Sequence, residues 1–232
     1  MSAGQVADEF RRRASFDSRH QLSEKVAAYV REAIMLGELQ AHQFIRTERL
    51  AEDLGVSATP VREALMILHS EGSVRWAPRR GFRVVPMTAR DVHDLFDVQA
   101  YIAGELAARA VDALDADEIK RLEGVQADLE QAARAGDTDL VDSLNHEIHR
   151  TINKASDAAR MGMLLNLTVH YVPLHSFGKI EGWAEASAHD HSGIFDALHN
   201  RDREAARTSM AEHIHHIGRL LVDHLEQHGV LS

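Results

Sequence analysis

The chain has 232 residues, with 26 Lys and Arg against 36 Asp and Glu, 16 His and no Cys. The lack of cysteine excludes disulfide frameworks, thiolate metal sites and cysteine nucleophiles. No run approaches the ~18 apolar residues that cross a bilayer, and the N-terminus has no secretory signal pattern. A hydrophobic content of 44% with only 4 Pro favours long helices around a packed core. We therefore expect a cytoplasmic, mainly α-helical protein.

The net charge of −10 is divided unevenly along the chain. Residues 1–90 hold 14 Lys and Arg and 11 Asp and Glu, a net of +3, whereas residues 91–232 hold 12 and 25, a net of −13. Only three of the 16 histidines lie in the first part. A basic segment suits a polyanion, and an acidic, His-rich segment suits a cation or a pH-sensitive site. The division predicts two segments with different partners.

The first part of the chain predicts three helices followed by a β-hairpin. Residues 1–20 have little periodic apolar content and are expected to form a flexible tail. Apolar spacing predicts helices over 23–36, 47–54 and 57–72. Two extended runs, 73–77 and 82–85, flank a Pro-Arg-Arg-Gly turn and predict the hairpin. This order of elements predicts a winged helix-turn-helix over residues 21–86.

The segment around the second and third helices carries features of a DNA-reading element. A recognition helix needs a short preceding helix, a tight turn, and small or polar residues at the end that enters the major groove. Gly55 supplies the turn, and Ser57, Thr59 and Arg62 supply donors on the first exposed turns. We expect these three side chains to contact DNA.

Arginines on either side of this segment are further candidates for DNA contact. Arg46 and Arg49 stand near the start of the second helix, where a phosphate contact is expected, and the choice between them stays open. Arg79, Arg80 and Arg83 lie on the hairpin, where a wing could follow phosphates or enter the minor groove. The alternative is that these arginines are ordinary solvated charges.

The same residues resemble the GntR family of bacterial transcription regulators. The matching motifs are Leu50-Ala51, Leu54-Gly55-Val56-Ser57, Thr59-Pro60-Val61-Arg62-Glu63-Ala64-Leu65 and the wing residue Gly81. The resemblance covers most of residues 22–86, implies a DNA-binding regulator and places Gly81 among the DNA-contacting residues. One departure is Ala58, which stands where family members commonly carry Arg. The operator is therefore expected to differ or to be read less strictly.

After Pro86 the pattern becomes purely helical, and we expect an antiparallel bundle of about six helices over residues 87–228. Cap patterns at Thr88 and Asp115 begin the first two helices. The remaining helices are expected at 138–154, 161–170, 188–199 and 202–227, with a loop over 176–187 around Gly178 and Gly182.

Several histidines of this bundle are spaced as metal ligands would be. Asn145 and His149 are four residues apart and project from one helix face, and His191 and His213 lie on later helices. Three imidazoles and one oxygen could converge inside the bundle and hold an ion such as Zn²⁺ or Ni²⁺. Spacing alone leaves other histidines equally available: His146, His189, His215 and His216.

The helical segment also resembles the C-terminal sensor domain of the FadR subfamily, called the FCD domain. The matching motifs are Asn145-His146-Glu147-Ile148-His149, His191 with Ile194-Phe195-Asp196-Ala197-Leu198, and Ala205-Ala206 with Met210-Ala211-Glu212-His213. The resemblance implies a divalent metal bound by Asn145, His149, His191 and His213. It also implies a homodimer joined through the helical domains and a small organic-acid effector that releases DNA.

The first of these ligands departs from the common pattern, because Asn145 replaces the usual Asp. A neutral oxygen ligand favours an imidazole-preferring ion, Zn²⁺ or Ni²⁺, over a hard cation. The alternative oxygen ligand is Asp142 acting through a water molecule.

These observations predict a regulator, most simply a repressor, that binds a double-stranded DNA operator and is not an enzyme. A first alternative keeps the DNA-binding dimer but gives the metal or pocket a purely structural role. A second alternative is a metal-dependent hydrolase with Glu147, Asp190 or Glu212 as the general base. It is disfavoured because no H-E-x-x-H pattern is present and the winged helix would have no purpose.

Overall fold

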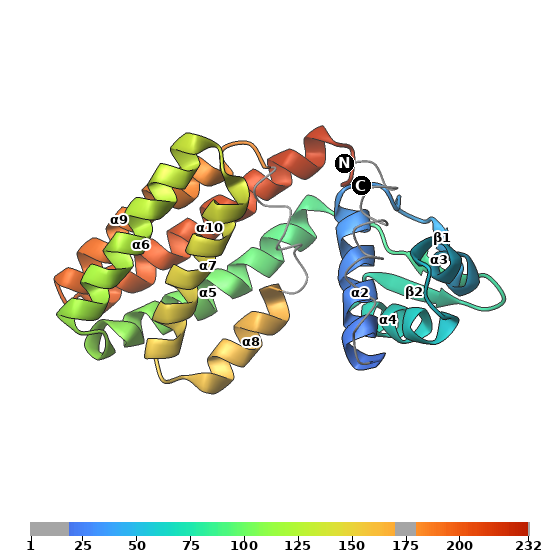
Figure 1. Cartoon of the computed structure of the whole chain (residues 1–232), viewed down its shortest axis with the longest axis horizontal. Helices are drawn as coiled ribbons and strands as arrows, with labels where there is room; N and C mark the ends of the chain where they lie inside the picture. Colours follow the sequence, from blue (N-terminus) through green and yellow to red (C-terminus); the bar gives the residue numbers. More distant parts are fainter. Residues whose placement is uncertain (1–18, 170–179, 232) are drawn as a thin grey trace. The chain divides into compact units, whose positions relative to one another are not determined.

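The computed structural model describes residues 19–169 and 180–231, which fall into two compact units (Figure 1). Among these residues, the first unit holds 19–89 and 225–231, and the second holds 90–169 and 180–224. The expected tail over residues 1–20 lies outside the described residues, apart from Arg19 and His20, which begin the first helix.

The first unit contains three helices and a small sheet. Its elements are α2 (Arg19–Met35), β1 (Phe44–Ile45), α3 (Thr47–Leu54), α4 (Ala58–Ser70), β2 (Val74–Ala77) and β3 (Gly81–Val84). The predicted winged helix-turn-helix is confirmed, with one difference in the sheet. β1 pairs antiparallel with β3, so the wing has three strands in the order β1-β3-β2. Two residues are too short a run for strand periodicity to reveal.

A glycine allows this third strand to join the hairpin. A Cβ atom on Gly81 would overlap the backbone carbonyl oxygen of Ile45 in β1. Gly81 also has a φ of 91°, a conformation that other residues rarely adopt. The wing glycine therefore has a structural role in holding β1 against β3.

The core of the first unit lies between the helices and the inner face of the sheet. Val30, Leu54, Leu65 and Phe82 are among its buried members and come from four different elements. Gly55, in the left-handed conformation with a φ of 69°, ends α3 and turns the chain into α4, as the sequence predicts.

The C-terminal segment belongs to this unit as well. Residues 225–228, which the sequence assigns to the helical segment, fall in the first unit together with the residues that follow. One contact that ties them there is at Gly37, where an added Cβ would be 3.3 Å from a side-chain methyl of Val230. Such a contact between distant residues leaves no pattern in the sequence.

The second unit is a bundle of six helices within the described residues. They are α5 (Ala89–Ala113), α6 (Ala116–Ala135), α7 (Thr138–Ala155), α8 (Ala159–Val169), α9 (Trp183–His199) and α10 (Arg203–Gln227). Asp115 caps α6 in a reciprocal capping box with Glu118, as its spacing predicts. No described helix is long and apolar enough to span a membrane.

The prediction that the second unit is a helical bundle is confirmed, but α9 begins earlier than the sequence predicts. The sequence predicts a loop over 176–187 and a helix start at 188, whereas α9 starts at Trp183. Gly182 has a φ of 80° and directly precedes the helix, so it marks a helix start rather than a loop interior. Trp183 is only 3% exposed, and its burial stabilises this first turn. Residues 170–179, including Pro173, lie outside the described residues.

The helix directions follow from contacts between side chains. Along α6, Glu123 contacts His199 of α9, and Gln126, further along α6, contacts His191 of α9. Residue numbers therefore rise along α6 as they fall along α9, so these two helices are antiparallel. Arg121 of α6 pairs with Glu147 of α7. The short connection from α6 makes α7 antiparallel to α6 too. α7 and α9 therefore run in the same direction.

A buried ion pair fixes α2 to the end of α4. Arg31 is 7% exposed, and its guanidinium donates two hydrogen bonds of 2.8 Å to the carboxylate of Glu71. We expect Arg31→Met to lower the free energy of unfolding of the first unit by about 3 kcal/mol, because the half-buried Glu71 charge loses the cation that its carboxylate binds. Urea denaturation of the full chain measures this change.

The matched control is Arg90→Met, because Arg90 is highly exposed and lies 3.8 Å from Asp94. This substitution should change the unfolding free energy by less than about 0.5 kcal/mol. Adding Glu71→Leu to Arg31→Met should recover part of the lost stability. Strictly additive losses in the double variant would show that the two side chains do not interact.

Candidate metal centre and DNA-binding surface

Three helices of the second unit bring three histidines to one point. His149 comes from α7, His191 from α9 and His213 from α10. One ring nitrogen of each lies within 4.8 Å of the other two, and the ring centroids are 4.7 to 5.2 Å apart. The parallel course of α7 and α9 allows side chains from both to face α10. The fold therefore assembles three of the four ligands that the sequence proposes.

Burial keeps two of these imidazoles neutral. Loss of hydration, and to a lesser extent the nearby rings of His213 and His146, together lower the pKa of His149 to about 3. Burial also lowers the pKa of His191 well below its ordinary value. A neutral imidazole carries one unprotonated nitrogen, which is the form that binds a metal ion.

The separations between the rings suit a shared ion. Nε2 of His149 lies 3.2 Å from Nε2 of His213. Two nitrogens about 2.1 Å from one tetrahedral ion would be roughly 3.4 Å apart. Nε2 of His191 is buried and has no hydrogen-bond partner among the residues that the structure describes, an arrangement that costs free energy unless something binds it. The residues present therefore fit a divalent metal.

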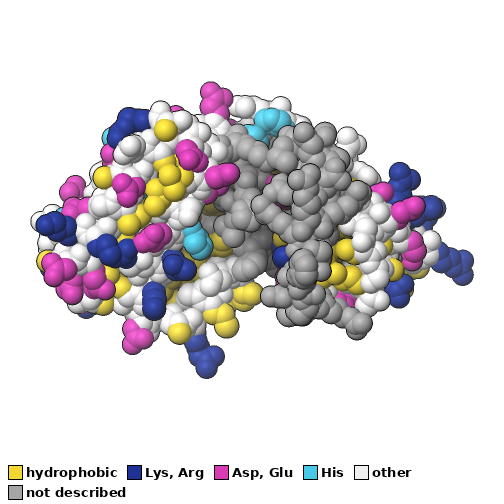
Figure 2. Space-filling model, in the orientation of Figure 1, with side chains coloured by type: hydrophobic (Ala, Val, Ile, Leu, Met, Phe, Trp, Pro, Cys, Tyr) yellow, Lys and Arg dark blue, Asp and Glu magenta, His cyan; other side chains and the backbone are white. Residues whose placement is uncertain are grey.

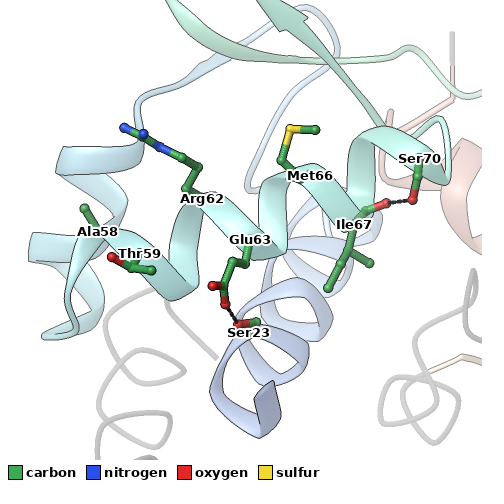
Figure 3. A pocket seen from close by; sticks show the side chains of 8 residues that line it. All are labelled: Ser23, Ala58, Thr59, Arg62, Glu63, Met66, Ile67 and Ser70. Carbon is green, nitrogen blue, oxygen red and sulfur yellow. Dashed lines mark hydrogen bonds between the residues drawn. The ribbon is translucent and has the colours of Figure 1, made fainter. Parts of the chain in front are cut away.

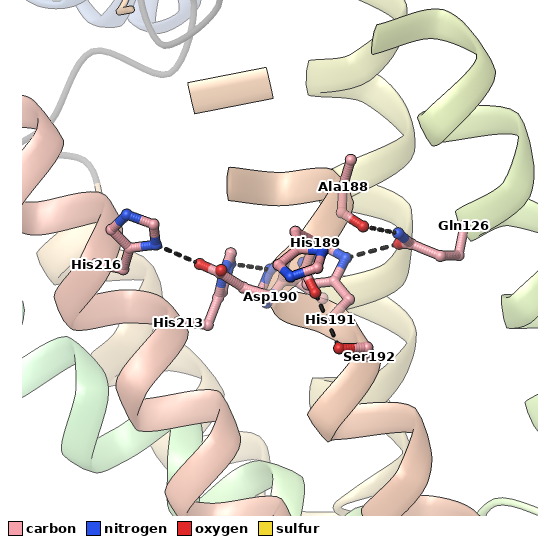
Figure 4. Close-up of polar contacts among 9 residues, drawn as sticks. Gln126, Ala188, His189, Asp190, His191, Ser192, His213 and His216 are labelled. Atoms are coloured by element: carbon pink, nitrogen blue, oxygen red, sulfur yellow. Dashed lines mark hydrogen bonds and ion pairs between the residues drawn. The ribbon is translucent and has the colours of Figure 1, made fainter. Parts of the chain in front are cut away.

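Gln126 of α6 determines which nitrogen of His191 carries the proton (Figure 4). The amide nitrogen of Gln126 donates to the backbone oxygen of Ala188 at 2.8 Å and to Glu130 at 3.2 Å. Its amide oxygen therefore faces Nδ1 of His191, 2.8 Å away, and accepts the Nδ1 proton. Nε2 of His191 is left with its lone pair free for a ligand.

Asp190 of α9 gives similar support to His213. Its carboxylate oxygen lies 3.4 Å from Nδ1 of His213 and 2.7 Å from Nδ1 of His216, both on α10 (Figure 4). Burial alone would raise the pKa of Asp190, but the hydrogen bonds with the two imidazoles lower it, so the carboxylate is charged. A carboxylate behind a histidine orients the ring and makes its other nitrogen a stronger ligand.

The sequence did not reveal the supporting roles of Gln126, Asp190 and His216. Gln126 lies 65 residues from its partner His191, so no local spacing connects the two. Asp190 directly precedes the proposed ligand His191, but consecutive helix residues point in different directions, so this position does not predict its contacts with His213 and His216 of α10.

The oxygen ligand expected from the sequence is Asn145. It lies one helical turn before His149 on α7, and its Oδ1 atom is buried and accepts no hydrogen bond from residues 19–169 or 180–231. An amide oxygen in this condition is available to a ligand. The carboxylate of Asp142 is not part of the histidine cluster.

The other candidate histidines lie apart from the cluster. His146 and His189 are exposed, His215 pairs with Asp97 at 3.1 Å, and His216 contacts Asp190. The carboxylates considered as general bases are engaged or exposed. Glu147 pairs with Arg121 at 2.7 Å, Asp190 accepts from two imidazoles, and Glu212 is exposed.

Helix α4, the candidate recognition helix of the first unit, has its first turns exposed to solvent. Ser57 is the N-cap of α4 but makes no capping hydrogen bond, and Thr59 and Arg62 are exposed. A hollow of about 790 Å³ lies along this side of α4 (Figure 3). Arg62 extends away from Glu63, whose carboxylate accepts a 2.5 Å hydrogen bond from Ser23 of α2. Arg62 is therefore free to reach an external partner.

The remaining DNA candidates lie around the reading helix in the same unit. Arg46 is the N-cap of α3, Arg49 lies within α3, and Arg79 and Arg80 form the turn before Gly81. All four arginines are exposed, and Gly81 is half-buried. Figure 2 shows Lys and Arg side chains gathered at the end of the first unit that carries the hairpin. Contact of these residues with DNA stays a prediction.

The lowered pKa values predict a pH-dependent stability for chelator-treated protein. Unfolded His149 and His191 bind protons near pH 6.5, whereas folded His149 does so only near pH 3. The unfolded state therefore binds more protons as the pH falls below about 6.5, and the unfolding free energy should decrease through that window. Urea denaturation at several pH values between 7.5 and 5 measures the slope.

The control for this experiment compares two neighbouring histidines. His149→Gln should make the dependence on pH shallower, whereas His146→Gln should leave it unchanged because His146 is exposed. A wild-type unfolding midpoint that is constant over this range would contradict the burial of neutral imidazoles.

Comparison with known proteins connects both units to one family. The model for bacterial regulatory proteins of the gntR family matches residues 22–84, and the FCD domain matches residues 94–216. The chain is 27% identical to the uncharacterized HTH-type transcriptional regulator YdhC of Bacillus subtilis, over 81% of this chain and 85% of that protein. It is 28% identical to the HTH-type transcriptional regulator McbR of Escherichia coli, over 84% and 85% of the two chains.

Two further similarities agree with this assignment. The chain is 31% identical to the gluconate operon transcriptional repressor of Bacillus licheniformis, over 59% of this chain and 57% of that protein. The solved structure of E. coli McbR/YncC superposes on this chain with a TM-score of 0.63 at 26% sequence identity. The superposition covers 91% of this chain and 99% of the McbR/YncC chain. The chain therefore belongs to the GntR family of bacterial regulatory proteins and combines a gntR-type helix-turn-helix unit with an FCD domain.

Proposed function

We propose that this regulator is a repressor whose helical unit binds a divalent metal and a small carboxylate effector that changes operator affinity. One observation carries the proposal: three histidines converge at one point, and neighbouring side chains orient the two buried ones, His191 and His213, in a chain that also holds a helix-turn-helix. The relative that is a gluconate operon repressor supports repression as the direction of control.

The metal would be held by His149, His191 and His213, with Asn145 as the oxygen ligand. This set carries no negative charge of its own, so it favours Zn²⁺ or Ni²⁺, which bind imidazole well. When bound, such an ion supplies positive charge and open coordination positions to a carboxylate group. Gln126 and Asp190 hold the ring nitrogens in place and so reduce the cost of assembling the site.

The effector acts by binding one arrangement of the helical unit more tightly than another. A ligand shifts such an equilibrium only by its difference in affinity for the two arrangements. Helices α7, α9 and α10 each contribute a ligand side chain, so a ligand at their junction touches three separate elements. Small shifts of these helices would transmit the effect of effector binding to the helix-turn-helix unit.

We also propose that the regulator works as a homodimer, because two-fold operators match two-fold proteins. Apolar side chains on the surface of the helical unit support this. Val98 and Tyr101 of α5 are 49% and 69% exposed, and Leu164 and Leu167 of α8 are 49% and 56% exposed. The two helices touch where Gln99 donates to the backbone oxygen of Thr168. A second copy would remove this apolar surface from water.

Replacing two of the three histidines tests the metal site. The double variant His191→Ala with His213→Ala should retain no Zn²⁺ after dialysis, whereas wild type should retain about one ion per chain, since one imidazole holds an ion weakly. Inductively coupled plasma mass spectrometry measures the stoichiometry. Gln126→Leu keeps all three ligands but should weaken Zn²⁺ binding by roughly 10- to 100-fold.

His189→Ala is the matched control, because His189 is exposed on the same helix as His191. It should leave the stoichiometry unchanged. Full retention of Zn²⁺ by the double variant would refute the site.

The DNA-binding role is tested with the upstream intergenic DNA of the regulator's own gene. Arg62→Ala should reduce operator affinity by about 1–3 kcal/mol through loss of base or phosphate contacts. Fluorescence anisotropy in a series of salt concentrations measures the operator affinity, and wild type should bind as two chains per duplex.

Arg134→Ala, at an exposed position in the last turn of α6, is the control. Equal affinity of Arg62→Ala and wild type at every salt concentration would remove Arg62 from the reading surface.

The same titration after chelator treatment separates the proposal from its first alternative. A changed operator affinity places the metal in the signalling path. Selective binding that the chelator leaves untouched favours the alternative, in which the site serves stability alone.

A further inference from the structure

We propose that the hydroxyl group of Ser187 on α9 binds the carboxylate of the effector, next to the three histidines. The proposal rests on the proposed function and deepens it, because it names a side chain that would hold the effector and is not itself a metal ligand. Ser187 belongs to none of the histidine motifs, and the sequence gives it no role.

Ser187 lies on the same face of α9 as His191. It stands four residues before His191, and side chains four residues apart on a helix are neighbours on one face. Helical side chains also lean toward the start of their helix, so the imidazole of His191 covers the turn that carries Ser187. Both residues have an exposed fraction of 0%. The Ser187 hydroxyl is therefore buried beside the ring of a proposed metal ligand.

The hydroxyl group of Ser187 has no hydrogen-bond partner within residues 19–169 and 180–231. Other hydroxyl groups on these helices bond locally: those of Ser70, Thr168 and Ser192 each donate to the carbonyl oxygen three residues earlier, at 2.7 to 3.0 Å (Figure 4 shows Ser192). A buried hydroxyl group that makes no such bond costs free energy. This exception indicates that a bound ligand supplies the partner of Ser187.

Asn145 has the equivalent position on α7. It stands four residues before His149, as Ser187 stands before His191, and α7 and α9 run in the same direction. The side chains of Asn145 and Ser187 therefore lie on the same side of the histidine cluster. Oδ1 of Asn145 is also buried, and no donor in the described part of the chain reaches it. Two unsatisfied polar atoms on one side of the cluster indicate where the effector binds.

The hydrogen-bonding character of these groups favours a carboxylate as the partner of Ser187. The unprotonated nitrogens of the histidines and the amide oxygen of Asn145 are acceptors, so they suit a cation. A hydroxyl group can donate, so it suits an anion bound to that cation. A carboxylate has two oxygens, and one can accept the Ser187 proton while the other faces the cation. Ser187 would thus orient the carboxylate without adding charge to the site.

The test compares Ser187→Ala with wild type in the full-length chain loaded with Zn²⁺. Alanine is the strongest helix former, so the variant should fold. Inductively coupled plasma mass spectrometry should find the same amount of Zn²⁺ per chain in both proteins, because Ser187 is not a metal ligand. Isothermal titration calorimetry with sodium acetate should show a roughly 10-fold lower affinity in the variant, because a hydrogen bond to a charged group is lost.

Ser192→Ala is the matched control. Ser192 is exposed on the same helix, and its hydroxyl group already donates to the backbone oxygen of His189. This variant should bind acetate with the affinity of wild type.

A second measurement tests the missing partner without any effector. Urea denaturation of chelator-treated protein compares Ser187→Ala with wild type in acetate-free buffer. The variant should unfold at the same urea concentration as wild type or at a higher one, because it loses a buried hydroxyl group that the protein leaves unsatisfied. A hydroxyl group with a structural partner would give the opposite shift, to a lower urea concentration.

The outcomes separate this proposal from the proposed function. Equal acetate affinity of wild type and Ser187→Ala overturns the role of Ser187 but leaves the carboxylate effector standing. Unfolding of chelator-treated Ser187→Ala at a lower urea concentration also overturns that role alone, because the hydroxyl group then has a partner in the protein or in a bound water molecule. Wild type that retains Zn²⁺ but does not bind acetate overturns both the carboxylate effector and the role of Ser187.

Discussion

The helical unit is organised around the burial of three imidazole rings at one point. Removing His149 and His191 from water keeps them neutral, and neutral rings have unprotonated nitrogens that need a partner. Four helices are committed to this arrangement, because α6 supplies Gln126 while α7, α9 and α10 supply the histidines. A purely structural core would satisfy these positions with apolar side chains. The retention of polar groups here is what argues for a bound ion.

The DNA-reading unit shows the opposite arrangement of polar groups. Its interior is apolar, and one well-bonded ion pair joins α2 to α4. Most of its other charged groups lie on the surface, and among the described residues no carboxylate forms an ion pair with Arg62. Unsatisfied lone pairs in one unit and uncompensated positive charges in the other both cost stability. A cation bound at the histidines and a DNA duplex bound at the surface arginines would each recover the corresponding cost.

The uneven charge of the chain fits this division of roles. The basic first part is suited to a DNA duplex, and the acidic, His-rich second part is suited to a cation. Family membership accounts for the order of the two units and for the motifs of the reading helix. Ala58 and Asn145 depart from the common pattern of the family. At these two positions the operator and the metal preference of this regulator would differ from those of its relatives.

The sequence by itself determined the kind and order of the elements, because apolar periodicity, caps and turn glycines act within a few residues. It also indicated His149, His191 and His213 through motifs that resemble a known domain. Tertiary structure alone decided which polar residues support them: Gln126, Asp190 and His216 act across helices, and no local pattern records such contacts. The same holds for β1, whose approach to β3 a side chain at Gly81 would obstruct, and for the C-terminal residues that pack at Gly37. Local patterns specify helices and turns, whereas a site depends on how distant segments meet.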